Sequence, residues 1–193
     1  MPRRPVHLDG RVVRRASALK TPRLTGGAAR GRPLAEVPPA GVRPTSARVR
    51  EALFSIVGQE LGGSRILDAC AGSGLLGLEA WSRGASVVAV EQNAKTYRRL
   101  RQNIEALGAS VTPMRGDVVR LATGLGTFDG IVVDPPYALD PTPLVDALGP
   151  CTTDWLVLES DANRPPPEVD ALAIDRRRTY GGTSLTLYRR RPS

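Results

Sequence analysis

The chain has 193 residues, a length that predicts one domain or one domain with an appendage. Hydrophobic residues make up 41% and charged residues 24%, which is enough apolar material for a core and excludes a wholly disordered chain. The formal net charge of +8 is unevenly distributed: residues 1–50 hold 12 basic and 2 acidic residues, and residues 51–193 hold 15 and 17. A basic arm therefore precedes a nearly neutral body.

The cysteine and histidine content excludes several kinds of chemistry. Cys70 and Cys151 are far apart in the sequence and the only histidine is His7, so we expect neither a disulfide framework nor a metal site, and no Ser-His or Cys-His catalysis. No apolar run approaches 18 residues, and residues 1–10 carry Pro, Arg and Asp where a signal peptide is apolar. These features predict a cytoplasmic protein without a membrane partner.

Residues 1–44 are predicted to form a basic N-terminal extension. Arg23–Leu34 has the pattern of a β-hairpin around its Gly-Gly pair, and the prolines of residues 37–44 predict an extended connector. Arginines in such an arm fit a polyanionic partner, whose phosphates they would neutralise. The alternative, a solvated or disordered extension, fits the charge equally well.

Residues 45–193 have the pattern of a single α/β domain. Thr45 or Ser46 caps a predicted helix that runs to Gly62-Gly63, and strands then alternate with helices. The apolar, β-branched strand centres are typical of parallel strands buried on both faces. The predicted strands are Arg65–Cys70, Ser86–Glu91, Ser110–Met114, Phe128–Asp134 and Trp155–Glu159, and the helices between the first three are Ser73–Ser82 and Asn93–Leu107.

The end of the chain departs from this alternation. Leu172–Arg178 and Thr183–Arg189 flank Tyr180-Gly181-Gly182, which predicts an antiparallel hairpin. The expected fold is therefore a doubly wound, mostly parallel, Rossmann-like sheet of seven strands that ends in an antiparallel hairpin.

A glycine-rich loop follows the first predicted strand. Gly72-Ser-Gly74-Leu-Leu-Gly77 is a GxGxxG motif that opens a helix, where bare backbone N–H groups can approach a ligand. Glu91 ends the second strand 19 positions after Gly72, where a carboxylate can accept hydrogen bonds from ribose hydroxyls. The combination predicts a cofactor that contains a nucleoside.

Two further acids favour S-adenosylmethionine over a dinucleotide. Asp68, beside the glycine loop, would repel a pyrophosphate but can pair with an amino group or a sulfonium. Asp117, after the third strand, supplies a carboxylate toward which an adenine amino group could donate. Each acid taken singly also fits an ordinary cap or turn residue.

Asp134-Pro135-Pro136-Tyr137 ends the fourth predicted strand and is the most specific motif of the sequence. The prolines fix φ and leave carbonyls without neighbouring N–H groups, while Asp134 and Tyr137 project at the ligand-binding edge of the sheet. A carboxylate and a free carbonyl can accept both hydrogens of an exocyclic amine, and an aromatic ring can stack on a base.

In this order and spacing, DACAGSG, VEQN and DPPY resemble the motifs of class I methyltransferases that act on exocyclic amines of nucleic-acid bases. With RLTGGAARGRPL, GVRPTSARVREALFSIV and the terminal TYGGTSLTLYRR, residues 23–193 resemble the bacterial small-subunit ribosomal RNA guanine-N2 methyltransferases. Residues 1–22 lie outside the resemblance, and Cys70 stands where the family often has a bulky apolar residue.

The resemblance implies an S-adenosylmethionine-dependent enzyme whose partner is ribosomal RNA or the assembling small subunit, and we expect a monomer. It implies that Asp134, Pro135 and Tyr137 position the guanine for catalysis. The residues implied to bind the cofactor are Asp68, Ala71, Gly72, Gly74, Glu91, Gln92, Asp117 and Val118. Arg43, Thr45, Arg48 and Arg50 lie on or just before the first predicted helix and are candidates for the RNA-binding side of the site. Thr45 can cap the helix, and the arginines can contact RNA phosphate or the cofactor carboxylate, although solvated arginines fit as well.

Two other functions fit part of the pattern. A DNA methyltransferase acting on adenine N6 or cytosine N4 would use the same Asp-Pro-Pro-Tyr geometry, although the small chain leaves no separate target-recognition domain. A non-catalytic RNA-binding assembly factor could retain the fold, but the intact Asp134 and Tyr137 disfavour it.

If the basic arm binds RNA, deletion of residues 1–40 should weaken RNA binding and flatten its dependence on salt, because fewer counterions are released. Cofactor binding should remain intact. The measurement is the slope of RNA affinity against salt concentration, and an unchanged slope would identify the arm as a linker.

Overall fold

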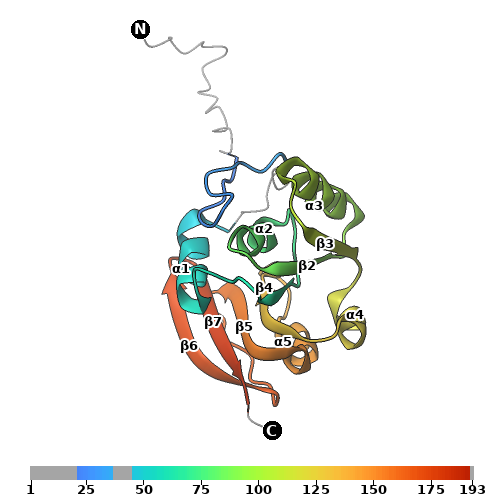
Figure 1. The fold of residues 1–193 in the computed structure, drawn as a ribbon. Helices are drawn as coiled ribbons and strands as arrows, with labels where there is room; N and C mark the ends of the chain where they lie inside the picture. The colour runs from blue at the N-terminus through green and yellow to red at the C-terminus, as the bar shows by residue number, and fades with distance from the viewer. Residues whose placement is uncertain (1–20, 37–44, 192–193) are drawn as a thin grey trace, which may run out of the picture.

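The computed structural model describes residues 21–36 and 45–191, in which seven strands form one sheet in the order β3-β2-β1-β4-β5-β7-β6 (Figure 1). Strands β1 to β5 are parallel to one another, whereas β7 lies antiparallel between β5 and β6. The strands are β1 Arg65–Asp68, β2 Ser86–Glu91, β3 Val111–Arg115, β4 Phe128–Val133, β5 Thr152–Asp161, β6 Leu172–Tyr180 and β7 Thr183–Arg190. This arrangement confirms the expected doubly wound sheet with its antiparallel C-terminal hairpin.

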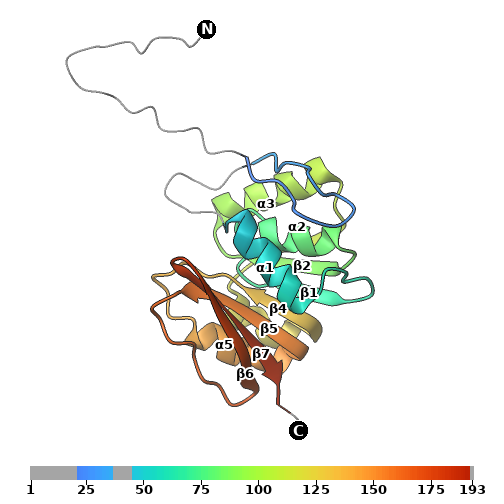
Figure 2. The same cartoon turned by 90° about the vertical axis from the view of Figure 1, so that its left-hand side faces the viewer.

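The sheet separates two hydrophobic clusters because successive strand residues point to opposite faces. In β1, Ile66 packs into the cluster that includes α1, α2 and α3, and Leu67 packs into the cluster that includes α4 and α5. Two views show the two groups of helices on opposite sides of the sheet (Figures 1 and 2). The helices are α1 Ala47–Val57, α2 Leu75–Ser82, α3 Ala94–Leu107, α4 Val118–Leu125 and α5 Thr142–Leu148, and a short 3₁₀ turn, η1, spans Gly149–Cys151. None of the helices among the described residues is long and apolar enough to span a bilayer.

Several local predictions are confirmed and others are corrected. Asn93 caps α3 and Gly108 ends it, as the sequence predicts. The first helix is shorter than predicted: α1 ends at Val57, because Gly58 takes a φ of 116° and breaks the helical backbone.

Helices α4 and α5 were not predicted. Helix α4 contains valine, threonine and glycine, which are weak helix formers, and Asp117 caps it. Helix α5 has seven residues, too few for a clear apolar period.

The segment of residues 21–36 packs against the sheet domain. Instead of a two-stranded hairpin, it forms a loop closed by a single antiparallel bridge between Arg23 and Pro33. Leu24, Ala29 and Leu34 are buried in the cluster that contains α1 and α2. The predicted boundary at residue 45 therefore separates parts that share one core, and a deletion to residue 40 would remove core side chains. A deletion that ends at residue 20 tests the basic arm without that loss.

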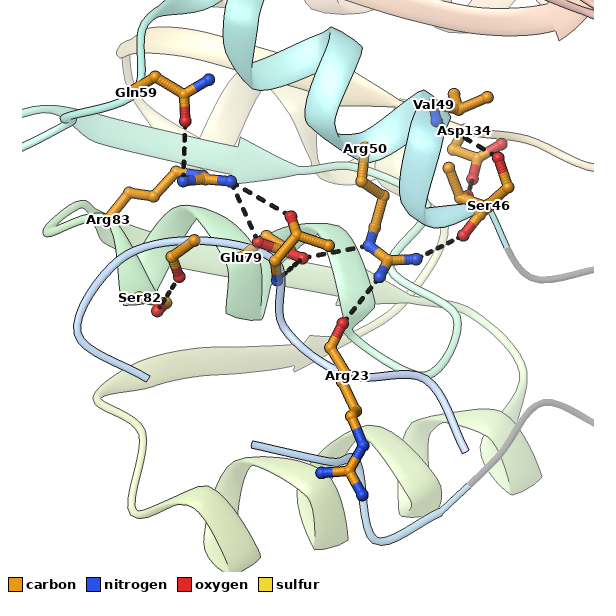
Figure 3. Close-up of polar contacts among 12 residues, drawn as sticks. Arg23, Ser46, Val49, Arg50, Gln59, Glu79, Ser82, Arg83 and Asp134 are labelled. Carbon is orange, nitrogen blue, oxygen red and sulfur yellow. Dashed lines mark hydrogen bonds and ion pairs between the residues drawn. The ribbon is translucent and has the colours of Figure 1, made fainter. Parts of the chain in front are cut away.

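A buried ionic network ties this segment to α1 and α2 (Figure 3). Glu79 of α2 pairs with Arg50 of α1 at 3.1 Å and with Arg83 at 3.4 Å, and all three side chains are almost fully buried. The backbone N–H of Thr25 donates to Glu79 Oε1 at 2.7 Å, and Arg50 donates to the Arg23 carbonyl at 2.8 Å. The Glu79 carboxylate thus connects α1, α2 and the segment of residues 21–36.

Replacing Glu79 by alanine should lower the free energy of unfolding by about 3–5 kcal/mol, because two buried arginines lose their counter-charge. Urea unfolding followed by circular dichroism measures the change. Glu105→Ala, at an exposed position of α3, is the matched control and should stay within about 0.5 kcal/mol of the native chain. A loss of similar size in both variants would contradict the role of the network.

Candidate active site

A cavity of about 890 Å³ opens at the edge where the parallel strands end. Its wall is formed by the loops after β1, β2, β3 and β4, by the residues preceding and beginning α1, and by the turn between β6 and β7. Ligands bind at this edge of doubly wound sheets because the strand order reverses there, so that the loops of neighbouring strands run in opposite directions and leave a crevice. The motifs predicted to act together therefore meet around one cavity.

Asp68 ends β1 and lies behind the glycine loop, residues 69–74. It is 1% exposed, and its Oδ2 accepts the backbone N–H of Gly77 at 2.8 Å. Its Oδ1 has no hydrogen-bond partner among the described residues. Burial raises the pKa of Asp68 to about 7; the Gly77 hydrogen bond opposes the rise, and the charges of Asp134 and Glu91 add to it. The carboxyl therefore holds an unfilled acceptor position under the loop.

Two glycines of the motif are required by close packing. A Cβ at Gly77 would lie 2.9 Å from Asp68 Oδ2, and one at Gly74 would lie 2.5 Å from a methyl carbon of Leu100. Gly74 also has a φ of 87°, which disfavours any side chain. These glycines let α2 approach both the Asp68 carboxylate and α3.

Glu91 ends β2 with its carboxylate held in place by backbone donors. Gly72 donates to Oε2 at 3.0 Å, and Asn93 donates to Oε1 at 2.6 Å. Both Glu91 and the adjoining Gln92 line the cavity. The predicted ribose-binding acid is thus fixed at the cavity wall next to the glycine loop.

Asp117 lines the cavity and also caps a helix. Its side chain accepts the backbone N–H of Val119 and lies 3.7 Å from exposed Arg120. Asp117 is therefore the N-cap of α4, the role that a single acid after a strand also fits. The adjacent Val118 lines the same cavity wall. Contact with an adenine remains a prediction.

Asp134-Pro135-Pro136-Tyr137 follows β4 directly and lines the cavity, with Asp134 next to the start of α1. The Thr45 hydroxyl donates to Asp134 Oδ2 at 2.7 Å, which leaves the other carboxylate oxygen for further donors. Burial raises the pKa of Asp134 to about 6, and the Thr45 hydrogen bond opposes the rise. Tyr137 is 40% exposed, and its hydroxyl lies 2.6 Å from that of Thr183.

Thr45 reaches Asp134 because the buried network holds its backbone. Arg50 donates to the Thr45 carbonyl at 2.6 Å while it pairs with Glu79 (Figure 3). Ser46, the next residue, caps α1 by accepting the N–H of Val49. The sequence left the cap open between these two residues, and the structure assigns it to Ser46.

Comparisons with known proteins show the family of the chain. A family model described as "Conserved hypothetical protein 95" matches residues 22–189. The chain belongs to this family. "Putative rRNA methyltransferase YlbH" of Bacillus subtilis (strain 168) is 32% identical over 182 residues, 88% of this chain and 99% of that protein. "Ribosomal RNA small subunit methyltransferase D" of Escherichia coli (strain K12) is 33% identical over 177 residues, 87% of this chain and 89% of that protein.

A solved structure shows the same fold. "Putative methyltransferase yhhF from Escherichia coli" superposes with a TM-score of 0.76 at 30% identity, covering 88% of this chain and 98% of that one. The family match begins at residue 22 and so includes residues 22–36 of the loop that packs on α1 and α2.

The structure brings most predicted site residues to the cavity, with four exceptions. Asp68 and Gly74 lie behind its wall, and Arg48 is an exposed residue of α1 outside the wall. Arg50 is buried in the ion pair with Glu79, so the expectation that it contacts phosphate or the cofactor is wrong. Arg43 lies outside the described residues. The predicted residues that line the cavity are Thr45, Ala71, Gly72, Glu91, Gln92, Asp117, Val118, Asp134, Pro135 and Tyr137.

Two polar residues near the cavity were missed. Glu159 of β5 lines the cavity beside Tyr137. The available signal was an acid at the end of the apolar run WLVLE, the same position that Glu91 has at the end of SVVAVE. Asn103 of α3 is fully buried and donates to the carbonyls of Ser73 and Glu36, which joins the glycine loop to the N-terminal segment. The pattern of apolar residues in α3 does not predict that the polar Asn103 is buried.

Replacing Thr45 by valine should raise the pKa of Asp134 above its value of about 6, because valine keeps the shape and removes the donor that stabilises the charged carboxylate. Carbon-13 NMR of aspartate carboxyls across pH measures the midpoint. Thr45→Ser keeps the hydroxyl and should leave the midpoint near the native one. Equal midpoints in the valine variant and the native chain would contradict the contact.

Proposed function

We propose that this chain is an S-adenosylmethionine-dependent methyltransferase that modifies N2 of a guanine in small-subunit ribosomal RNA. The observation that carries the proposal is the position of Asp134 and Pro135 at a cavity that also contains the glycine loop and Glu91. The relatives named as ribosomal RNA methyltransferases support the same reaction class. The guanine N2 target follows from the sequence resemblance.

The residues that line the cavity, together with Asp68 behind its wall, fit a cofactor that combines a nucleoside with a cationic sulfonium. The fixed Glu91 carboxylate offers acceptors for ribose hydroxyls, and the unpartnered Oδ1 of Asp68 indicates an unfilled polar position under the loop. Burial first, and then the charges of Asp134 and Glu91, raise the pKa of Asp68, so a bound cation would relieve the repulsion among these carboxylates. The cofactor, when bound, supplies a methyl group on a positively charged sulfur.

The guanine amine is a weak nucleophile because its nitrogen lone pair is delocalised into the ring. Asp134 Oδ1 and the Pro135 carbonyl would accept its two hydrogens and direct the lone pair toward the methyl carbon. With the cofactor bound, a nitrogen–carbon bond would form as its carbon–sulfur bond breaks, and the electron pair of that bond would remain on sulfur. The extra proton then leaves the cationic nitrogen for water, so Asp134 acts chiefly by orientation and charge.

The test is transfer of a labelled methyl group to total RNA, assembled small subunits and DNA in parallel, followed by nucleoside analysis. N2-methylguanosine in small-subunit RNA is the expected product. Methylated adenine or cytosine in DNA would replace this proposal with a DNA amino-methyltransferase. Lack of transfer to every substrate would favour an RNA-binding assembly factor.

Replacing Asp134 by alanine should lower turnover by about 10²–10³-fold or more, because the amine loses its charged acceptor. S-adenosylmethionine affinity, measured by calorimetry, should change by only a few fold. Asp146→Asn, at an exposed position of α5, serves as the control with native turnover. Near-native turnover of the Asp134 variant would contradict the assigned role.

A further inference from the structure

Glu159 is a buried carboxyl group at the cavity that the proposed chemistry does not use. It belongs to β5, is 4% exposed and lines the cavity. Among the described residues, its Oε1 accepts a long hydrogen bond of 3.4 Å from the Tyr137 hydroxyl, and its Oε2 has no hydrogen-bond partner. The Thr45 hydroxyl, which donates to Asp134, also lies near enough to lower the pKa of Glu159. A carboxylate can accept about four hydrogen bonds, so most of this capacity is unfilled.

The sheet register places Glu159 beside Asp134. Val133 of β4 pairs with Leu158 of β5, so the next residues along the two parallel strands are Asp134 and Glu159. Neighbouring strands lie about 4.7–4.9 Å apart, and residues in register on parallel strands point to the same face. Burial first, and then the charge of Asp134, raises the pKa of Glu159 to about 8. Two carboxyl groups therefore stand side by side at the cavity.

Two adjacent acceptors fit a ligand edge with two adjacent donors. Guanine presents N1–H next to its N2 amine, whereas adenine and cytosine present an unprotonated ring nitrogen next to theirs. A ring-nitrogen lone pair facing a carboxylate would be repelled and left without a donor. Of the three bases with an exocyclic amine, only guanine matches this pair of acceptors.

We propose that Glu159 selects guanine by accepting its N1–H, while Asp134 and the Pro135 carbonyl accept the hydrogens of N2. This inference rests on the proposed function and assigns the base specificity of the same site. The Tyr137 hydroxyl, held by Thr183 at 2.6 Å, positions the Glu159 carboxyl from one side. Substrate donors fill the remaining acceptor positions, which favours the ionised carboxylate.

The experiment compares guanine with 2-aminopurine at the methylated position. The analogue keeps the N2 amine but has an unprotonated N1 and no O6, so the change of the ratio between the native chain and Glu159→Gln reports the N1 contact. It is placed in the RNA or reconstituted subunit that accepts the methyl group. The native chain should prefer guanine by about tenfold or more in kcat/KM. In Glu159→Gln the amide can donate to N1, so the ratio should move toward 2-aminopurine by about tenfold or more.

The controls separate recognition from a structural role. Glu105→Gln, at an exposed position of α3, should keep the native ratio, and Tyr137→Phe tests whether loss of the hydroxyl contact alone changes it. Native preference for guanine is measured without any variant, so a poorly folded Glu159→Gln protein does not remove the test. Equal use of both bases by the native chain would overturn the inference.

Two other outcomes also count against the selection of guanine by Glu159. An equal loss with both bases in Glu159→Gln, or the same shift of the ratio in Tyr137→Phe, would make Glu159 a positioning residue for Tyr137. Transfer to guanine in either case would leave the proposed function standing. Transfer only to adenine or cytosine would overturn the inference together with the proposed function.

Discussion

The buried carboxylate of Glu79 is the interaction on which fold and site both depend. It forms ion pairs with Arg50 and Arg83 and accepts the backbone N–H of Thr25. These contacts fix α1, α2 and the loop of residues 21–36 relative to one another. Arg50 then holds the Thr45 carbonyl, and the Thr45 hydroxyl holds Asp134. Because a buried charge without partners is costly, this chain of contacts forms as a unit with the core.

A second constraint is the concentration of acids at one sheet edge. Asp68, Asp134 and Glu159 all have raised pKa values, chiefly through burial, and neighbouring carboxylates add to the rise in Asp68 and Glu159. Such a site is unfavourable while it holds only its own charges. It gains stability from a cation and from N–H donors, which are the groups that a sulfonium cofactor and a base amine bring.

The sequence predicted the architecture well where local pattern and tertiary packing agree. Buried strands showed as apolar runs, and caps such as Asn93 fixed the helix that follows. It failed where packing overrides propensity: α4 forms from weak helix formers because Val118, Ala122 and Leu125 fill the core beside α5. The basic character of residues 1–50 likewise hid the apolar contacts of Leu24 and Leu34.

By itself, the sequence determined which acids follow which strands, because each motif is local and parallel strands bring their carboxyl ends to one edge. Only the tertiary structure decided which of these groups touch. Thr45 meets Asp134 across 89 positions, and Glu159 stands beside Asp134 through the register of β4 and β5. Burial, hydrogen-bond partners and pKa depend on such distant neighbours, so Asp68 lies behind the cavity while Glu159 lines it.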